Sequence, residues 1–299
     1  MSTVGPSWEL YGTFLAVMRE GSLSGASRAL GLAQPTVRRR IEELEQALDV
    51  VLFTRATNGL VPTESAHSTM PHAEAMAASA VAVVRALSAP ANVERGTVRI
   101  TASEIVGVEV MPGLLAPVLH AHPQLQIEIV PTNRQQDLLR RDADIAIRMV
   151  APTQHALVAK RAAVIRVGVY AHESYLAEHP VRRLGDLRGC LVGADTERGL
   201  IDALATHGLE TTRKDYAVRA DSQLAQLAAV RAGLGVGVCQ VPLAARWPEL
   251  VRVLPSIDVP LEAWVVMHED QRALRRVRVV FDALVDGLAA YAKPRRQAR

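Results

Sequence analysis

Apolar residues in the first fifty positions recur every three or four residues, which is the period of an α-helix that packs along one side. Two such stretches, residues 8–19 and 22–30, predict helices that each end at a glycine. A third predicted helix runs from about Gln34 to Leu48, with Pro35 in its first turn, where the missing N–H costs nothing. Its buried stripe is expected to consist of Val37, Ile41, Leu44 and Leu48. Its opposite, polar face is expected to carry Thr36, Arg39, Arg40, Glu43 and Gln46.

A β-hairpin is predicted directly after the third helix. Residues 50–63 form two short apolar runs on either side of Asn58-Gly59, and an Asn-Gly pair is the strongest short-range signal for a tight hairpin turn. The second and third helices are joined by the short turn of residues 31–33, and the third opens with Gln, Thr and a run of arginines. This order of elements has the form of a helix-turn-helix, and the hairpin would be its wing.

An alanine-rich helix is predicted over residues 64–89, which contain few residues that favour strands. Its apolar stripe is narrow and made of small residues, which indicates a seam between two helices, so we expect a dimerisation helix. Pro71 should kink or delay this helix, because proline removes a backbone hydrogen bond. Proline and glycine in residues 90–96 then indicate a hinge.

Beyond the hinge, short β-branched runs alternate with helical patterns. The predicted strands are residues 97–101, 125–130, 144–149, 164–170, 190–193, 216–219, 236–239, 251–254 and 263–267. The predicted helices are residues 107–120, 135–141, 173–178, 199–207, 222–232 and 271–291. This alternation predicts parallel-rich sheets covered by helices, which is the α/β class.

The predicted organisation is therefore an all-α winged helix-turn-helix followed by a long linker helix and a larger α/β domain of two subdomains. The boundaries are expected at residues 1–64 for the winged helix-turn-helix, 65–89 for the linker helix, 90–96 for the hinge and 97–299 for the α/β domain. Subdomain one would comprise residues 97–165 and 268–292, and subdomain two residues 166–267.

Composition agrees with a globular chain of two domains, because 299 residues that are 49% hydrophobic can bury more than one core. The net charge of +3 is compatible with nucleic acid, but acidic residues offset the basic ones in the first ninety positions. A DNA-binding surface must therefore come from how the arginines cluster. Neither a secretory signal nor an apolar stretch of membrane-spanning length is visible, which predicts a cytoplasmic protein.

The sequence offers little for catalysis or metal binding. Cys190 and Cys239 lie far apart in apolar settings and are expected to be buried thiols. The histidines show no metal-ligand spacing, and neither a nucleophile elbow nor a phosphate-binding loop is present. The glycines at positions 233, 235 and 237 enter a predicted strand, whereas a dinucleotide-binding fingerprint leaves one. We therefore expect no metal, no cofactor and no catalytic site.

Two regions resemble the LysR-type transcriptional regulators. The first region resembles the DNA-binding signature of that family. It consists of residues 21–30 and 33–37, Ile41, Leu44, Glu45, Leu48, Leu52, Phe53, Arg55 and Thr63. The second region resembles the effector domain of the family. It includes residues 111–115, Pro123, residues 144–147 and residues 232–237. The resemblance thus extends over nearly the whole chain.

This resemblance implies a homo-oligomer, usually a dimer of dimers, in which linker helices pair and the effector domains have a fold similar to periplasmic solute-binding proteins. Binding of a small molecule would then alter DNA bending and transcription. The chain departs from the usual pattern at Ser27, Arg38, Asp49, Pro62 and Ala66. Of these, Arg38 adds a cation at the start of the recognition helix, and Asp49 needs a positive φ if it keeps its helix-ending role.

Candidate DNA contacts lie on the first turns of the predicted recognition helix and on the wing. Residues at the start of such a helix reach base edges in the major groove, where Gln pairs with adenine and Arg with guanine. The alternatives are a solvated basic face for the cluster, turn formation for Asn58 and a surface salt bridge for Arg28. The candidate residues are Arg28, Gln34, Pro35, Thr36, Arg38, Arg39, Arg40, Arg55 and Asn58.

Candidate effector contacts follow the ends of the predicted strands, because α/β folds bind ligands where strands end and helices begin. The candidate residues are Ser103, Glu104, Ile105, Thr132, Asn133, Arg148, Met149, Asp221 and Ser222. Ser103 and Ser222 are equally well explained as helix N-caps. Arg148 favours an anionic ligand, although an ion pair with Glu104 or Asp221 would give the same sequence.

The sequence therefore predicts a sequence-specific DNA-binding transcription regulator that responds to a small-molecule effector and is not an enzyme. The first alternative is a ligand-independent DNA-binding protein. The second is an α/β enzyme or solute-binding protein, because two-lobed α/β domains also host catalysis and transport.

Overall fold

A computed structural model describes residues 5–56, 59–87, 91–133, 143–152, 157–194, 205, 206, 208 and 210–293. The chain divides into two compact units, the first extending to Leu87 and the second containing the remainder of the described chain. None of the described helices is both long enough and apolar enough to cross a lipid bilayer.

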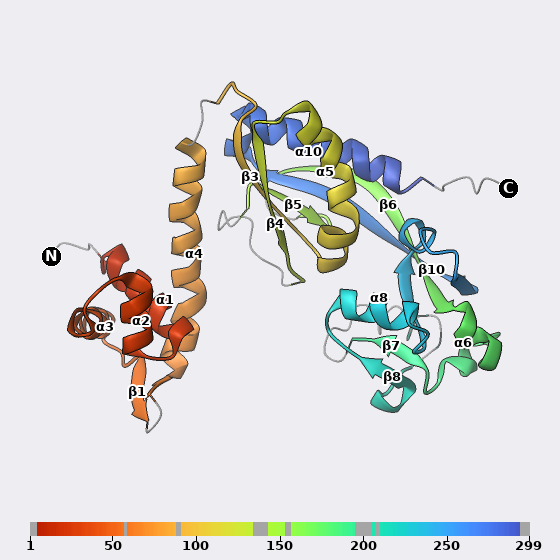
Figure 1. Cartoon of the computed structure of the whole chain (residues 1–299), viewed down its shortest axis with the longest axis horizontal. Coiled ribbons are helices and arrows are strands. Elements are labelled where there is room, and N and C mark those ends of the chain that lie inside the picture. The colour runs from red at the N-terminus through yellow and green to blue at the C-terminus, as the bar shows by residue number, and fades with distance from the viewer. Residues whose placement is uncertain are drawn as a thin grey trace. The chain divides into compact units, whose positions relative to one another are not determined.

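The first unit combines three short helices, a two-stranded hairpin and one long helix (Figure 1). Its elements are α1 (Trp8–Glu20), α2 (Leu23–Leu30), α3 (Gln34–Leu48), β1 (Phe53–Ala56), β2 (Gly59–Pro62) and α4 (Glu64–Leu87). Gly21 and Gly31 end α1 and α2 with φ values of 66° and 65°, which glycine adopts at little cost. Asp49 ends α3 at a φ of 54°, as its helix-ending role requires. The predicted helices and hairpin are confirmed.

The core of this unit lies between α1, α2, α3, β1 and α4. Its buried members are Phe14, Leu15, Val17, Ala26, Val37, Ile41, Leu44, Leu52, Ala66 and Ala73. The rings of Phe14 and Phe53 lie 5.8 Å apart and join α1 to the hairpin. The predicted stripe of α3 is therefore buried as expected, with Leu48 at its margin.

The long helix α4 starts immediately after the hairpin and continues through Pro71, so the expectation that Pro71 would delay the helix is wrong. Thr63 caps the helix, because its Oγ1 accepts a hydrogen bond from the backbone N–H of Ala66 at 3.2 Å. Ala66 and Ala73 are both fully buried against the core, one on either side of the proline. Their packing holds both sides of the helix in place and offsets the local cost of Pro71.

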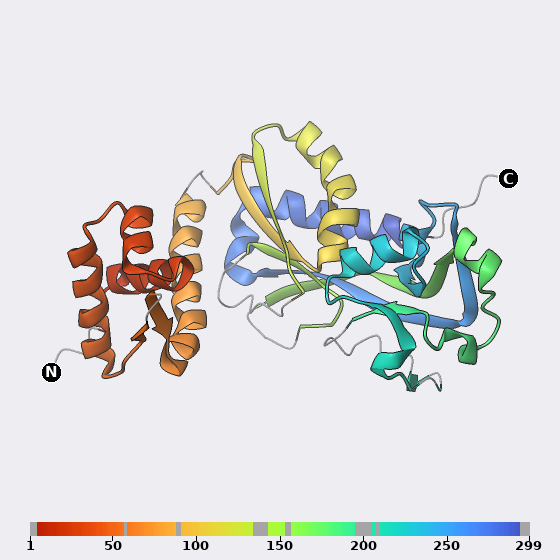
Figure 2. The same cartoon turned by 60° about the horizontal axis from the view of Figure 1, so that its bottom comes forward.

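The second unit is built on an eight-stranded mixed sheet in the order β4-β3-β5-β10-β6-β9-β7-β8. The strands are β3 (Gly96–Ala102), β4 (Leu125–Pro131), β5 (Ile145–Arg148), β6 (Leu157–His172), β7 (Leu191–Gly193), β8 (Tyr216–Arg219), β9 (Val236–Gln240) and β10 (Leu250–His268). β3 pairs in parallel with β4 and β5, and β7 with β8 and β9, while β6 and β10 form antiparallel pairs. Figures 1 and 2 show β6 and β10 passing between the two halves of this unit, of which the first half contains β3, β4 and β5 and the second half contains β7, β8 and β9.

The two strands predicted at residues 251–254 and 263–267 are the ends of one strand, β10. The apolar pattern is interrupted between them, but β10 stays paired with β6 across a register shift between Val253 and Asp258. Leu254, at a φ of 47°, takes up the change of direction at this shift. The separate strands were therefore a wrong prediction, because a bulge interrupts the sequence pattern without ending the pairing.

The helices of the second unit lie in both halves. They are the π-helical turn η1 (Val106–Val110), α5 (Met111–Ala121), α6 (Glu173–Glu178), α8 (Gln223–Arg231), α9 (Val241–Ala244) and α10 (Arg275–Tyr291). Short 3-10 turns are η3 (Leu184–Leu187), η4 (Arg213–Asp215) and η5 (Glu269–Ala273). The helix predicted at residues 135–141 lies outside the described residues, as does nearly all of the one at residues 199–207.

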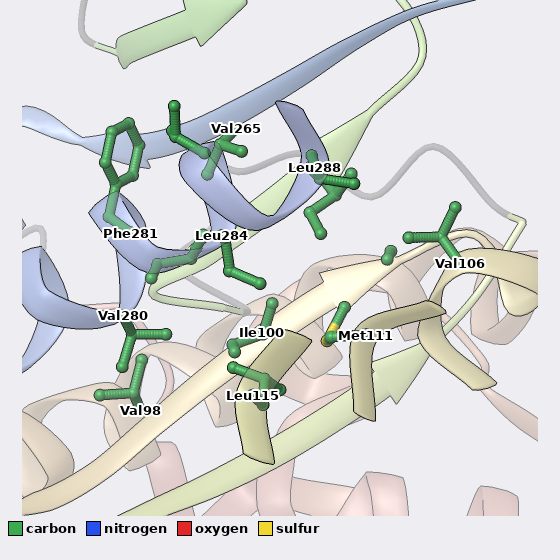
Figure 3. Packing of buried hydrophobic residues seen from close by; sticks show 14 of the residues in the cluster. Val98, Ile100, Val106, Met111, Leu115, Val265, Val280, Phe281, Leu284 and Leu288 are labelled. Atoms are coloured by element: carbon green, nitrogen blue, oxygen red, sulfur yellow. The ribbon is translucent and has the colours of Figure 1, made fainter. Parts of the chain in front are cut away.

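Each half has its own hydrophobic core. In the first half, Leu284 and Leu288 of α10 face Ile100 of β3 and Met111 and Leu115 of α5 (Figure 3). The core of the second half comprises two packed groups that include Val169, Ala171, Leu187, Leu191, Val236, Leu227, Val230 and Leu243. Cys190 and Cys239 are buried free thiols of this half, as predicted. The side chains of Ile105 and Tyr291 contact the cores of both halves and join them.

Candidate DNA-binding surface and effector site

The turn between α2 and α3 is closed by its own hydrogen bonds. The Ser27 hydroxyl donates to the backbone oxygen of Leu32 at 2.5 Å, and the N–H of Leu32 donates to the backbone oxygen of Ser27 at 3.1 Å. Ser27 thus forms a side-chain hydrogen bond across the turn. An alanine, which has no hydroxyl, could not form this bond at the same position, where Ser27 departs from the usual family pattern. These bonds tie the last turn of α2 to the turn that leads into α3.

The first turns of α3 present a mixed polar and basic surface. Gln34, Pro35, Arg38 and Arg39 are exposed, and Thr36 is partly exposed. An α-helix turns by about 100° per residue, so Arg39 projects away from the buried Val37 and Ile41. Its side chain is 71% exposed, and its Nε lies 3.4 Å from Glu43 Oε1 on the same helix. Arg28 is exposed in the last turn of α2.

Arg40 does not lie on the polar face of α3 where the sequence placed it. Its Nη2 lies 2.6 Å from Glu9 Oε2 of α1, and its Nη1 donates to Thr13 Oγ1 at 3.5 Å. Its side chain is only 23% exposed. The expectation for Arg40 was wrong because position 40 follows the buried Val37 by three residues and therefore borders the buried stripe.

The wing is tied to α3 by Glu45, which the sequence indicated only as part of the family resemblance and without a structural role. Glu45 Oε1 accepts hydrogen bonds from the backbone N–H groups of Leu52 and Phe53, at 2.7 and 3.1 Å. A signal was available, because a carboxylate near a helix C-terminus is unfavourable unless it has a partner. Arg55 belongs to β1 opposite Leu60, whereas its side chain and the whole of Asn58 lie outside the described residues.

The candidate effector residues of the first half gather at one edge of the sheet. β3, β4 and β5 are parallel neighbours, with Ala102 opposite Pro131 and Thr101 opposite Ala146, so their carboxyl ends meet. These ends carry Ser103, Glu104, Ile105, Thr132, Asn133, Arg148 and Met149. The backbone N–H of Glu104 donates to Asn133 Oδ1 at 3.1 Å. The sequence thus predicted correctly which strand ends lie together.

Ser222, in the second half of the unit, contacts the strand ends of the first half through Glu104. Its hydroxyl donates to Glu104 Oε2 at 2.9 Å and also accepts from the backbone N–H of Ala225 at 3.4 Å, which caps α8. The N-cap role considered for Ser222 is therefore confirmed, and its neighbour Asp221 is exposed. The Ser103 hydroxyl makes no hydrogen bond within the described part of the chain, although its backbone oxygen accepts from Gly107.

Arg148 stands out electrostatically. Its Nη1 donates to the backbone oxygen of Ile147 at 3.1 Å, and its Nη2 is buried without a hydrogen-bond partner among the described residues. Burial lowers the pKa of the guanidinium, and no ion pair with Glu104 offsets this cost in the described structure. Thr101 Oγ1 and Gln223 Oε1, which neighbour the candidate residues in sequence, are likewise buried and unpartnered within the described residues. In the same described residues, no group of three or more His, Cys, Asp or Glu side chains is placed to hold a metal ion.

Comparison with known families matches both parts of the chain. Residues 8–67 match the family described as bacterial regulatory helix-turn-helix protein, lysR family, and residues 91–289 match the LysR substrate binding domain. The chain belongs to the LysR family of transcriptional regulators. It therefore combines a DNA-binding helix-turn-helix with a substrate-binding domain, and the resemblance seen in the sequence is confirmed.

Individual relatives agree with this assignment. A probable HTH-type transcriptional regulator LtrA of Klebsiella pneumoniae is 25% identical over 290 residues, which is 93% of each chain. An HTH-type transcriptional regulator of Xanthomonas campestris pv. campestris is 29% identical over 166 residues, and this match spans 56% of this chain and 48% of the relative. The crystal structure of full-length CbnR complexed with its target DNA has a similar fold, with a TM-score of 0.66 at 20% identity, covering 93% of this chain and 99% of that one.

Proposed function

We propose that this regulator reads DNA with the first two turns of α3. The observation that carries this proposal is the exposure of Gln34, Arg38 and Arg39 on a helix start held by the Ser27–Leu32 turn. Gln34 and Arg38 can donate bidentately to purine edges in the major groove, while Arg39 is assigned to a phosphate. Arg28, Pro35, Thr36, Arg55 and Asn58 complete the proposed surface with contacts to the DNA backbone and the minor groove.

The test measures binding to two DNA duplexes. One is selected by the wild-type chain from a random pool, and the other is a scrambled duplex of the same composition that serves for comparison. Arg38→Gln should weaken binding to the selected duplex by about tenfold and relax selection at one base position, which is the cost of losing a good base contact. Arg278→Gln removes an exposed charge from α10 and serves as the control. Failure of the wild-type chain to select any sequence would contradict the proposal.

We further propose that the effector is a small anionic molecule bound beside Arg148. The Arg148 guanidinium is partly buried and has no ionic partner among the described residues, which costs free energy that a ligand carboxylate or phosphate would offset. Ser103, Thr132 and Asn133 would supply hydrogen bonds from one half, and Ser222 and Asp221 would close the site from the other. Glu104, Ile105 and Met149 would complete its wall.

Thermal shift of the full chain against carboxylates, phosphates and their neutral amides or esters tests this ligand class. An anionic compound should raise the unfolding temperature of the wild-type chain by mass action, and Arg148→Met should lose that shift. Arg161→Met, at an exposed Arg161–Glu262 ion pair of the same unit, should keep it. Equal shifts by anionic compounds and their neutral analogues would rule out the anionic class.

We also propose that the chain forms a homo-oligomer, as a dimer of dimers, through α4. An apolar groove on the first unit is lined by Trp8, Ala75, Met76, Ser79 and Ala80. Met76 and Val84 are 40% and 70% exposed, which is unusual for apolar side chains on one helix of a monomer. Such a surface fits pairing of α4 with α4 of a second copy.

Light scattering during size-exclusion chromatography tests the oligomer. The double variant Met76→Glu and Val84→Glu should lower the molecular mass, because two carboxylates would be buried at the seam. His67→Glu, on an exposed part of the same helix, should not. A monomeric wild-type chain would contradict the proposal.

The proposed role places the protein with its DNA in the cytoplasm and involves no catalytic step.

A further inference from the structure

We infer that Arg40 is a positioning residue of the DNA-binding unit, which fixes α3 against α1 so that its exposed neighbours meet the DNA, and that Arg40 itself is not a phosphate ligand. The inference rests on the DNA surface proposed above. It divides three consecutive arginines into two roles, with Arg38 and Arg39 facing the DNA and Arg40 facing the protein.

The partners of Arg40 form a prepared acceptor site on α1. Glu9 and Thr13 are four residues apart and therefore lie on the same face of that helix. The Thr13 hydroxyl donates to the backbone oxygen of Glu9 at 2.8 Å, which leaves its lone pairs free to accept from Arg40. Thr13 is only 1% exposed, so this acceptor has little freedom to move.

Two contacts from one planar group define an orientation, whereas a single contact defines only a distance. The guanidinium of Arg40 bonds Glu9 through Nη2 and Thr13 through Nη1. These bonds join α1 and α3, beside the buried contacts of Val37 and Ile41 with the core. Rotation of α3 about its own axis would break both bonds, so the pair fixes the direction in which Gln34 and Arg38 project.

Arg39 lacks these properties. Its partner Glu43 is one turn along the same helix, so their contact cannot fix α3 against any other element. Its side chain is 71% exposed and stands opposite the buried stripe. Exposed pairs of this kind are worth little, and Arg39 can leave Glu43 for a phosphate at small cost. Arg39 is therefore the matched control for Arg40.

The experiment measures binding of the full chain to its selected duplex and to the scrambled duplex across a range of salt concentrations. Arg40→Gln should weaken binding to the selected duplex by about threefold, with little change on scrambled DNA or in the salt dependence. Glu9→Gln should act in the same direction, and the double variant should be no worse than Arg40→Gln alone, because loss of Arg40 already removes the contact with Glu9. Arg40→Lys, which keeps the charge and can still reach Glu9, should recover part of the loss.

Arg39→Gln should instead weaken both duplexes alike and reduce the slope of log K against log salt by about 0.9, as loss of one phosphate contact does. Glu20→Gln removes a carboxylate from the same helix as Glu9 and measures the general effect of that charge.

The opposite outcome is equally distinct. If Glu9 only competes with DNA for Arg40, Glu9→Gln will strengthen binding to both duplexes and steepen the salt dependence, while Arg40→Gln will flatten it. That result would overturn the inference, as would an Arg40→Gln variant that is less stable to heat yet binds both duplexes normally. A wild-type chain that selects no sequence would instead refute the proposed DNA surface and would be recognised before any variant is compared.

Discussion

Glu45 and Leu52 are joined by a 2.7 Å hydrogen bond from the backbone N–H of Leu52 to the Glu45 carboxylate, which ties the last turn of α3 to the start of the wing. The same oxygen accepts from Phe53, whose ring packs against Phe14 of α1. One carboxylate thus connects α3, the hairpin and the core of the first unit.

Glu45→Ala should loosen this connection. Hydrogen bonds to a charged acceptor are each worth about 1.5–3 kcal/mol, and Leu52 is fully buried, so its N–H would be left without a partner. We expect the amides of Leu52 and Phe53 to exchange with solvent at least tenfold faster in the variant. Hydrogen exchange of the full chain measures this, with Glu42→Ala, at an exposed position of α3, as the control. Unchanged protection of both amides would show that the bonds are dispensable.

Arg148→Met should leave the ligand-free chain equally stable or make it more stable. The substitution removes a partly buried charge that lacks an ionic partner in the described structure and replaces it with an apolar side chain of similar length. Arg166→Met should lower the unfolding temperature, because Arg166 pairs with the Asp258 carboxylate between β6 and β10. Differential scanning calorimetry without ligand compares the two. A clear loss of stability in Arg148→Met would mean that this guanidinium is compensated within the protein.

Asp215 predicts a dependence of stability on pH. Hydrogen bonds from the backbone N–H of Thr212 and from its hydroxyl, together with Arg188, hold the pKa of Asp215 below its ordinary value of 3.8. A carboxylate with a lowered pKa in the folded state stabilises the protein above its unfolded pKa, and this contribution is lost as the pH falls through the folded pKa.

Asp215→Asn should therefore lower the unfolding temperature at pH 7, and the difference from wild type should shrink as the pH is lowered below about 4. Asp282→Asn, at an exposed position of α10, should have little effect at pH 7. A difference between Asp215→Asn and wild type that is the same at pH 7 and pH 3 would attribute the loss to packing and not to the ionised carboxylate.

Both cysteines should resist alkylation in the folded protein. Burial raises the pKa of the Cys239 thiol to about 12 and also raises that of Cys190, so both thiols are mainly protonated at pH 8. Mass spectrometry after iodoacetamide treatment should find neither residue modified, whereas both should react after denaturation. Rapid labelling of native Cys190 would indicate that its part of the second half opens more often than its burial implies.

Much of this fold was readable from the sequence because its elements follow regular periods. The helical stripe of α3 and the strand of residues 216–219 were predicted at or near their observed bounds, since local spacing alone determines them. The two ends of β10 were separated wrongly, because a sequence pattern cannot show that pairing with β6 continues across a bulge.

The candidate sites divide in the same way. The sequence correctly assigned Ser103, Asn133 and Arg148 to neighbouring strand ends, because parallel β3, β4 and β5 follow a simple topological rule. It could not show that Arg40 turns toward Glu9, which is 31 positions earlier. Such contacts depend on the packing angle between two helices, and this angle cannot be predicted from the residue types alone.

α10 is the last described helix of the second unit in the sequence, and this sets the order in which the two units can fold during synthesis. The core of the first half contains Val98 and Ile100 near its beginning and Leu284 and Leu288 near its end. A ribosome must therefore translate β6 through β10, including the whole second half, before α10 can cover β3 and α5. The described residues of the first unit end at Leu87, so its core can form before the second unit is translated. The DNA-binding unit can therefore fold well before the substrate-binding domain has closed its core.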